Sequence, residues 1–253
     1  MSRSRLLLAI GVVVIAVGIG GFIVYDQVLR GDSAAALTLP TASSTPAAST
    51  APAASTGTGT GASTAPATTS DGSVAGTWNV AAESVAGYRV REQLANLPAE
   101  SDAVGRTDQV TGSITLESSG STTTLTAGAL TVDTTSITSD KSQRDNRMRD
   151  EGLQTDQFPT ATFTLTKPVE IPAEALAGTA SEVTLTGDLT LHGVTKSVQI
   201  PAKAQLVNGT VSVAGSLSFP LSDFGMTAPN IGGFIVSIAD HGTLEFAVNF
   251  SKG

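Results

Sequence analysis

The sequence contains no cysteine and only two histidines, and aromatic and charged residues make up just 4% and 14% of its 253 residues. Without cysteine the chain has no disulfide framework, no thiol nucleophile, no thiolate metal site and no acylated cysteine that could anchor a lipoprotein. Two histidines offer little to an imidazole metal site. We therefore expect no metal, no cofactor and no transition-metal chemistry.

Basic residues are also scarce. The chain has 14 Lys and Arg against 22 Asp and Glu, which gives a net charge of -8 and an isoelectric point near 4.7. Binding to nucleic acid requires basic side chains that neutralise phosphates, so a nucleic-acid partner is not expected. Acidic and basic residues balance in residues 1–72, and the whole net charge therefore lies in residues 73–253.

One long apolar run stands near the N-terminus, from Leu6 to Val24, and contains no charged side chain. As a helix its 19 residues would extend roughly 28 Å, which matches the hydrocarbon core of a bilayer. Arg3 and Arg5 precede the run, and positive charge favours the cytoplasmic side. The sequence predicts a cytoplasmic N-terminus (1–5), a transmembrane signal anchor (6–25) in the cytoplasmic membrane, and an extracytoplasmic remainder.

A cleaved signal peptide is the alternative, because Ala34, Ala35 and Ala36 form a small-residue cleavage site. The protein would then be secreted. The apolar run is longer than the usual hydrophobic region of a signal peptide, and charged residues separate it from the alanines. We favour retention as an anchor.

Residues 33–69 consist of Ala, Ser, Thr, Pro and Gly, with Leu37 and Leu39 as the exceptions. Such a composition cannot bury enough apolar surface to fold. We predict a disordered linker over residues 26–75. As a flexible coil, the 37 residues from 33 to 69 would span about 33 Å on average.

Beyond residue 73, apolar residues alternate with Thr or Ser, which is the period of a half-buried strand. The clearest predicted strands are residues 161–165, 183–191, 211–219 and 244–250, and weaker ones are 88–93, 110–116, 124–132 and 194–200. Asn208-Gly209 and His192-Gly193 predict tight hairpins. The charged interval 139–156 predicts a short helix or ordered loop over one end of the sheet. The expected fold class is all-β, a sandwich or a barrel.

Five motifs of this region occur in the order typical of one family. They are Gly76-Thr77-Trp78, the segment Arg144–Arg149, the segment Phe158–Phe163, the segment Leu189–Lys196, and Asp223–Met226. Residues 76–253 thus resemble the YceI-like family. One position departs from the family pattern, because Arg147 stands where the family usually has His, and Met148 replaces Leu. No role of that His can be transferred to this chain.

The resemblance implies an antiparallel lipocalin-like barrel of about eight strands around a tunnel for a polyisoprenoid or related fatty lipid, without catalysis. It also implies a bacterial protein of the periplasm or cell envelope. Apolar strand residues and one aromatic residue are the candidate lipid-binding residues: Trp78, Phe163, Leu165, Leu185, Leu189, Leu191, Val213, Leu217, Phe219, Phe246 and Val248. A tightly packed core would use the same residues.

Basic residues gather in the charged interval, where Arg144, Arg147 and Arg149 are candidate contacts for an anionic lipid head group. Self-pairing is the simpler interpretation, because Asp140 with Arg144 and Asp145 with Arg149 have the favourable helical spacing. His192 and His241 lie in turn-like triplets, where bonds to local backbone are expected rather than catalysis.

The sequence therefore predicts a membrane-tethered, extracytoplasmic protein that holds a long apolar lipid in its barrel and is not an enzyme. The alternative is a non-catalytic surface interaction or structural module whose barrel is filled by side chains. An enzyme acting on lipid-like substrates ranks third. The oligomeric state does not follow from these residues.

Overall fold

The computed structural model describes residues 33–40, 73–94, 100–228 and 235–253. The predicted cytoplasmic residues 1–5, the predicted anchor over residues 6–25 and most of the predicted linker lie outside these ranges. Within the described ranges, no helix combines the length and apolar character needed to cross a bilayer.

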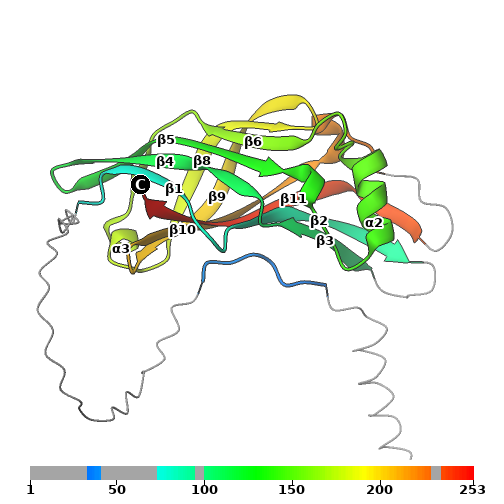
Figure 1. The fold of residues 1–253 in the computed structure, drawn as a ribbon, viewed down its shortest axis with the longest axis horizontal. Helices are drawn as coiled ribbons and strands as arrows, with labels where there is room; N and C mark the ends of the chain where they lie inside the picture. Colours follow the sequence, from blue (N-terminus) through cyan, green and yellow to red (C-terminus); the bar gives the residue numbers. More distant parts are fainter. Residues whose placement is uncertain (1–32, 41–72, 95–99, 229–234) are drawn as a thin grey trace, which may run out of the picture.

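In the described part of the chain, eleven antiparallel strands form one continuous sheet (Figure 1). They are β1 (Gly76–Val80), β2 (Val85–Leu94), β3 (Ser101–Thr107), β4 (Val110–Ser119), β5 (Thr122–Asp133), β6 (Thr160–Leu165), β7 (Val169–Ile171), β8 (Ser181–Leu191), β9 (Val194–Val207), β10 (Thr210–Pro220) and β11 (Ile235–Lys252). All eight predicted strands are confirmed, and β1, β3 and β7 are additional.

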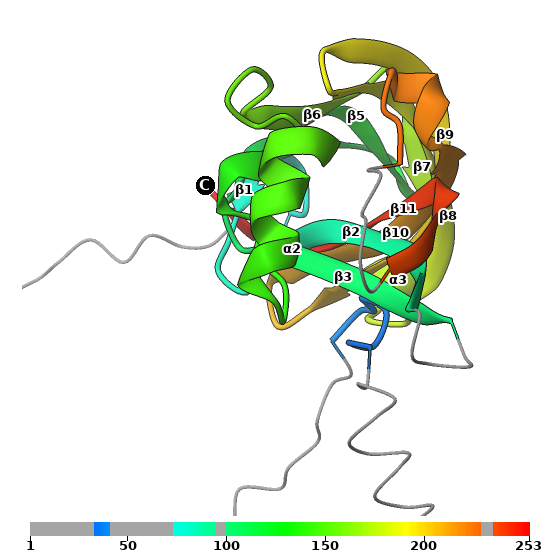
Figure 2. The same cartoon turned by 90° about the vertical axis from the view of Figure 1, so that its right-hand side faces the viewer.

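Eight of the described strands close into a barrel in the order β1, β4, β5, β6, β8, β9, β10 and β11, which confirms the predicted eight-stranded antiparallel barrel. Residues 250–252 of β11 pair with β1 and complete the ring. Closure removes the exposed strand edges of an open sheet. Figure 2 views the ring from the end that carries the longest helical segment.

β2 and β3 extend the wall where β1 ends. The earlier part of β11 pairs with β2, and β2 pairs with β3. Arg106 on the outer edge of β3 then makes a backbone bridge to Thr138. β11 is therefore connected to the far side of the wall in two ways. At one end β1 joins β11 to β4, and at the other end β2 and β3 join β11 to the segment after β5.

Short helical segments lie at the two ends of the barrel (Figure 1). Between β5 and β6 lie η1 (Thr134–Ser136), α2 (Ser142–Arg147) and η2 (Met148–Gly152), which confirm the predicted helix in the charged interval. The segment η3 (Leu221–Phe224) shares a hydrophobic cluster with Leu153, directly after η2. α3 (Ala173–Leu176) lies at the opposite end. We call the end with α2, η2 and η3 the α2 end.

Two tight hairpins follow from residue types that accept a positive φ. Asn208 and Gly209 have φ of 51° and 76° and join β9 to β10, and His192 and Gly193 have φ of 51° and 71° and join β8 to β9. Two central residues with positive φ form the turn that matches the twist of antiparallel strands. Both hairpin predictions are confirmed.

The expected turn at His241 is wrong. His241 lies inside β11, opposite Pro220 of β10, at an irregularity where the pairing with β2 skips from Ile238 to Gly242. The extra residues form a bulge, and glycine is common at such positions. A turn and a bulge draw on the same small and polar residues, so the triplet did not distinguish them.

The eight residues 33–40, which we call the strap, also differ from the expectation of a disordered linker. They have no regular secondary structure but lie against the outside of the barrel (Figure 1). Leu37 and Leu39, the two exceptions to the small-residue composition, are half-buried there. Composition alone could not reveal the strap because its partners on the barrel are polar side chains.

Candidate functional site

An apolar cavity occupies the inside of the barrel. Its volume is about 160 Å³, counted as the space that the centres of water molecules can reach. A single water needs roughly 10–15 Å³ on this measure, so the space is much larger than a packing defect. The barrel interior is therefore not completely filled by side chains.

The described residues that line the cavity are almost all apolar, and none carries a charge. The polar exceptions are Tyr88, Thr134, Thr162 and Thr243. The apolar lining consists of Ala86, Val90, Val110, Ile114, Leu125, Ala129, Leu130, Val132, Ile137, Met148, Leu153, Ala161, Phe163, Leu165, Leu185, Leu189, Leu191, Ile200, Val213, Phe219, Leu221, Met226, Leu244, Phe246, Val248 and Phe250, with Gly87, Gly128 and Gly242. Such a wall suits a hydrocarbon chain and offers few directional contacts.

Strand alternation produces this wall. In β8 every second residue is buried, namely Val183, Leu185, Gly187, Leu189 and Leu191, while the residues between them, three threonines and Asp188, are more exposed. Some inward residues remain half-buried because they border the cavity instead of packing against the opposite wall. Phe163, Leu165, Val213 and Leu244 belong to this group.

The two ends of the cavity differ. At the end opposite α2, buried Trp78 packs in the same hydrophobic cluster as Phe250, and its indole N–H donates to the Val74 carbonyl at 3.0 Å. At the α2 end the lining comes from the helical segments, through Met148, Leu153 and Leu221. We call Trp78 and Phe250 the aromatic plug. The cavity thus runs from this plug towards the α2 end.

Nine of the eleven candidate lipid-binding residues line the cavity, and the two others lie nearby. Trp78 is part of the plug, and Leu217 packs against both hydrophobic clusters of the barrel. A ligand contact stays a prediction for all eleven. Lining residues such as Ile114 and Leu130 were not selected, although both lie on the weaker predicted strands, whose alternation was the available signal. Met148 and Leu153 gave no such signal.

The three candidate head-group residues have different surroundings. Arg144 donates to Glu92 of β2 at 2.6 Å and also to Asp140, and its side chain is only 14% exposed. Burial would lower the pKa of Arg144, but the hydrogen bond and attraction to Glu92 and the contact with Asp140 outweigh burial and raise it. Arg147 is exposed, and Arg149 donates to Asn146 at 3.4 Å. Arg144 is therefore already neutralised by two carboxylates.

Asp145 does not pair with Arg149 as its spacing suggested. Its buried carboxylate instead accepts from the backbone N–H of Ser139 at 2.8 Å and from the Ser139 hydroxyl at 2.6 Å. Asp140 and Arg144 do form the expected pair. The charged interval therefore holds itself in place over the α2 end, largely through its own residues and Glu92.

Tyr88 is the aromatic hydroxyl of the cavity wall. Burial raises the pKa of Tyr88 above its ordinary value of 10, and the positive charge of Arg144 offsets part of that rise. The phenol therefore stays neutral at physiological pH. It offers a hydrogen-bond donor beside an apolar space.

Neither histidine shows catalytic geometry. The Nδ1 atom of His192 lies 3.2 Å from the Phe224 carbonyl of η3, and its ring packs 4.5 Å from that of Phe158. The backbone partner is thus supplied by another loop, not by the local turn that we expected. His241 contacts neighbouring Asp240 at 2.6 Å. Across the described ranges, no group of three His, Asp or Glu residues could hold a metal ion.

Comparison with known proteins agrees with this geometry. The family model described as the YceI-like domain matches residues 78–250. Among curated proteins, Protein YceI of Shigella flexneri and Protein YceI of Escherichia coli O157:H7 are each 39% identical over 75 residues. Those residues make up 29% of this chain and 35% of the length of either relative.

A solved structure described as a polyisoprenoid binding domain from Saccharophagus degradans implicated in plant cell wall breakdown has the same fold. It aligns with a TM-score of 0.54 and 20% sequence identity, over 71% of this chain and 99% of that domain. At this level of identity the similarity extends to the architecture of the barrel.

Proposed function

Because the chain belongs to the YceI-like family, whose members are binding proteins and not enzymes, we propose that it holds an extended apolar lipid inside its barrel. The ligand class we propose is a polyisoprenoid or a related fatty chain. The observation that carries the proposal is the uncharged, apolar cavity enclosed by a closed barrel. The polyisoprenoid binding described for the structurally similar domain supports this choice of ligand.

The energetics of such a site favour chain length over head-group chemistry. Each methylene that leaves water gains about 0.8 kcal/mol, so ten buried carbons gain about 8 kcal/mol before ordering costs are subtracted. The plug at Trp78 closes the far end, and the α2 end provides Tyr88 as a neutral donor. We propose that the apolar chain enters from the α2 end and that its polar end stays near Tyr88.

The pairing of Arg144 affects the head-group hypothesis. Its charge is compensated by Glu92 and Asp140, so it offers little net attraction to an anionic head. Arg147 and Arg149 are the residues of the interval on which anionic head-group contacts would depend. We propose that a neutral or weakly polar head is accepted as well as a charged one.

The membrane placement is part of the same proposal. The apolar run over residues 6–25 would anchor the chain in the cytoplasmic membrane of a bacterium, with the barrel on the extracytoplasmic side. A lipid carrier or store so placed would act on lipids of that membrane. Cleavage after Ala36 would instead release the barrel in secreted form.

Native mass spectrometry of the full-length chain, purified from the membranes of a bacterial host, tests the proposed ligand. The expected result is a mass increment that extraction identifies as a prenyl or fatty chain. Repeated recovery of an empty barrel that binds no added lipid would contradict the proposal and would favour the surface module. Turnover of added lipid would indicate an enzyme.

A further inference from the structure

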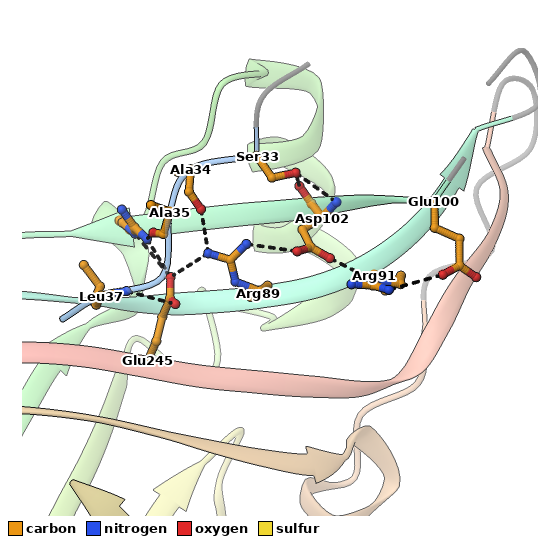
Figure 3. Close-up of polar contacts among 10 residues, drawn as sticks. Ser33, Ala34, Ala35, Leu37, Arg89, Arg91, Glu100, Asp102 and Glu245 are labelled. Carbon is orange, nitrogen blue, oxygen red and sulfur yellow. Dashed lines mark hydrogen bonds and ion pairs between the residues drawn. The ribbon is translucent and has the colours of Figure 1, made fainter. Parts of the chain in front are cut away.

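The strap is bound to the barrel by an organised set of polar contacts. Arg89 donates to the Ala34 carbonyl at 2.6 Å, Arg106 donates to the Ala35 carbonyl, and the Leu37 N–H donates to Glu245 at 3.4 Å (Figure 3). These contacts engage the strap's backbone, so they depend on its path more than on its side chains. The small side chains of Ala34 and Ala35 allow the arginines to come close to the strap's backbone carbonyls.

The receiving surface is a row of alternating charges on the outer faces of β11, β2 and β3 (Figure 3). Glu245 pairs with Arg106 at 2.8 Å and lies 3.6 Å from Arg89, and Arg89 pairs with Asp102 at 3.0 Å. The two arginines still have donors left over after these pairs form. Strap carbonyls occupy those donors, so the strap completes hydrogen bonding that the barrel leaves open.

The strap has a defined direction along the barrel. At its start, the Ser33 hydroxyl contacts the backbone of Asp102, donating to the carbonyl at 3.2 Å and accepting from the N–H at 3.1 Å. Asp102 follows Ser101, which pairs with Glu92, the partner of Arg144 in α2. At its end, Gln205 near the Asn208 hairpin donates to the Pro40 carbonyl at 3.0 Å. The strap thus begins at the α2 end and runs towards the plugged end.

We propose that the strap fixes the α2 end of the barrel, towards which the cavity runs, next to the membrane that carries the N-terminal segment. This inference rests on the membrane anchor of the proposed function. From residue 25, at the end of the predicted anchor, eight residues lead to Ser33 and reach at most about 28 Å. Without docking, the first barrel contact would lie 48 residues away, near Ser73, with a maximal reach of about 160 Å.

The interaction surface assigned here is therefore the α2 end, and its partner is the lipid bilayer itself. A fixed, short distance would keep the end of the cavity near the membrane that supplies a lipid. The opposite end would point away, because β9, the strand between the two tight hairpins, has 14 residues and extends about 46 Å.

The absence of cysteine makes this arrangement measurable in the full-length chain. Gln143→Cys labels the exposed surface of α2, and Ser119→Cys labels the exposed β4–β5 hairpin at the other end. Each labelled protein is reconstituted into phosphatidylcholine vesicles that contain a trace of acceptor-labelled lipid, and energy transfer to the bilayer is measured. The expected result is clearly higher transfer from position 143 than from position 119.

A strap variant and a matched control test the cause. Ser33→Ala with Leu37→Pro removes the hydroxyl contact and the N–H that donates to Glu245, and both changes lie outside the strands. Ser44→Ala with Ala48→Pro introduces the same two residues, Ala and Pro, at the same spacing further along the linker. We expect loss of the difference between the two labels in the strap variant and full retention in the control.

Equal transfer from both labels in the unmodified chain, or a difference that survives in the strap variant, would overturn the proposal. So would failure of the chain to float with the vesicles, or a mature N-terminus at Leu37 in the native host. Native mass spectrometry of the same preparations separates this inference from the proposed ligand. If position 143 shows higher energy transfer than position 119 but no lipid is bound, the result would support the role of the strap and contradict the proposed ligand.

Discussion

Glu245 illustrates how a carboxyl side chain on the outside of the barrel can be buried. Its side chain is 3% exposed and accepts from Arg106 and from the strap N–H of Leu37. An isolated carboxylate could not remain charged in such a position, but paired and hydrogen-bonded carboxylates can. The sequence could not reveal this pair, because Arg106 and Glu245 are far apart along the chain.

We predict that Glu245→Gln destabilises the barrel by about 1–3 kcal/mol, because it leaves Arg106 without its charged partner. Glu100→Gln is the matched control, since Glu100 pairs with Arg91 where both side chains are more than half exposed. That change should cost much less, because solvent and salt screen an exposed pair. Urea unfolding measures both values, and equal effects would contradict the assigned role of Glu245.

Tyr88 yields a prediction on pH dependence. Its pKa is raised in the folded protein, so between the unfolded value near 10 and the higher folded value the folded state binds more protons than the unfolded state. Stability from this group is complete below pH 10 and should fall as the pH rises above it. In a Tyr25→Phe chain, which leaves Tyr88 as the single tyrosine, phenolate absorbance should appear above pH 10 in the folded protein and near pH 10 in urea. Identical titration curves would contradict this.

At the scale of single elements, hydrophobic periodicity predicted the strands whose apolar residues all lie on one face. Strands with one inward apolar face, such as β8 and β10, were predicted within one or two residues of their bounds. β1, β3 and β7 were missed for separate reasons. β3 has adjacent buried residues at 103–105 in place of alternation, and β7 has only three residues. β1 is recognisable mainly by Trp78.

The limits of alternation also explain why the cavity was predictable only in part. Alternation identifies which strand residues point inward, but it does not show whether opposite walls touch. Met148 and Leu153 reach the cavity from a helical segment whose many charges concealed them. The pairing of Arg144 with Glu92 depends on how α2 is placed over β2, which local spacing does not encode.

Glycines at two elements separate two mechanisms of destabilisation. Gly209 lies at the β9–β10 turn with φ of 76°, and a Cβ there would meet no atom within 4 Å. Gly209→Ala should therefore cost about 1–2 kcal/mol from backbone conformation alone. At Gly187 in β8, a Cβ would overlap the Thr164 carbonyl and the Phe163 ring.

We expect Gly187→Ala to destabilise the protein more than Gly209→Ala, since backbone or an aromatic ring must move. Thermal unfolding of both variants by circular dichroism compares them directly. If Gly209→Ala were the more destabilising change, β6 and β8 could move apart more easily than their close pairing suggests.

For the whole molecule, a ligand in the cavity should act on global stability. Lipid that binds only the folded barrel stabilises it by about 2.7 kcal/mol at one hundred times its dissociation constant. We therefore predict that delipidated protein unfolds at a lower temperature than loaded protein and recovers when a prenol or fatty acid is added. An unfolding temperature that does not change with lipid concentration would argue against an interior site.

The most direct test of the account is whether filling the cavity abolishes lipid binding. Gly128 of β5 borders the cavity, and a Cβ there would lie 3.4 Å from Ile114 and 3.7 Å from Leu165, so Gly128→Phe directs a ring inward. Ala127→Phe places the same ring on the exposed outer face of the same strand.

The measurement is equilibrium binding of a radiolabelled polyprenol to residues 33–253 in the unmodified form and in both variants. We predict that Gly128→Phe weakens binding by at least about tenfold, a loss of about 1.4 kcal/mol, while Ala127→Phe binds like the unmodified protein. Equal binding by all three folded proteins would contradict the claim that the lipid lies inside the barrel.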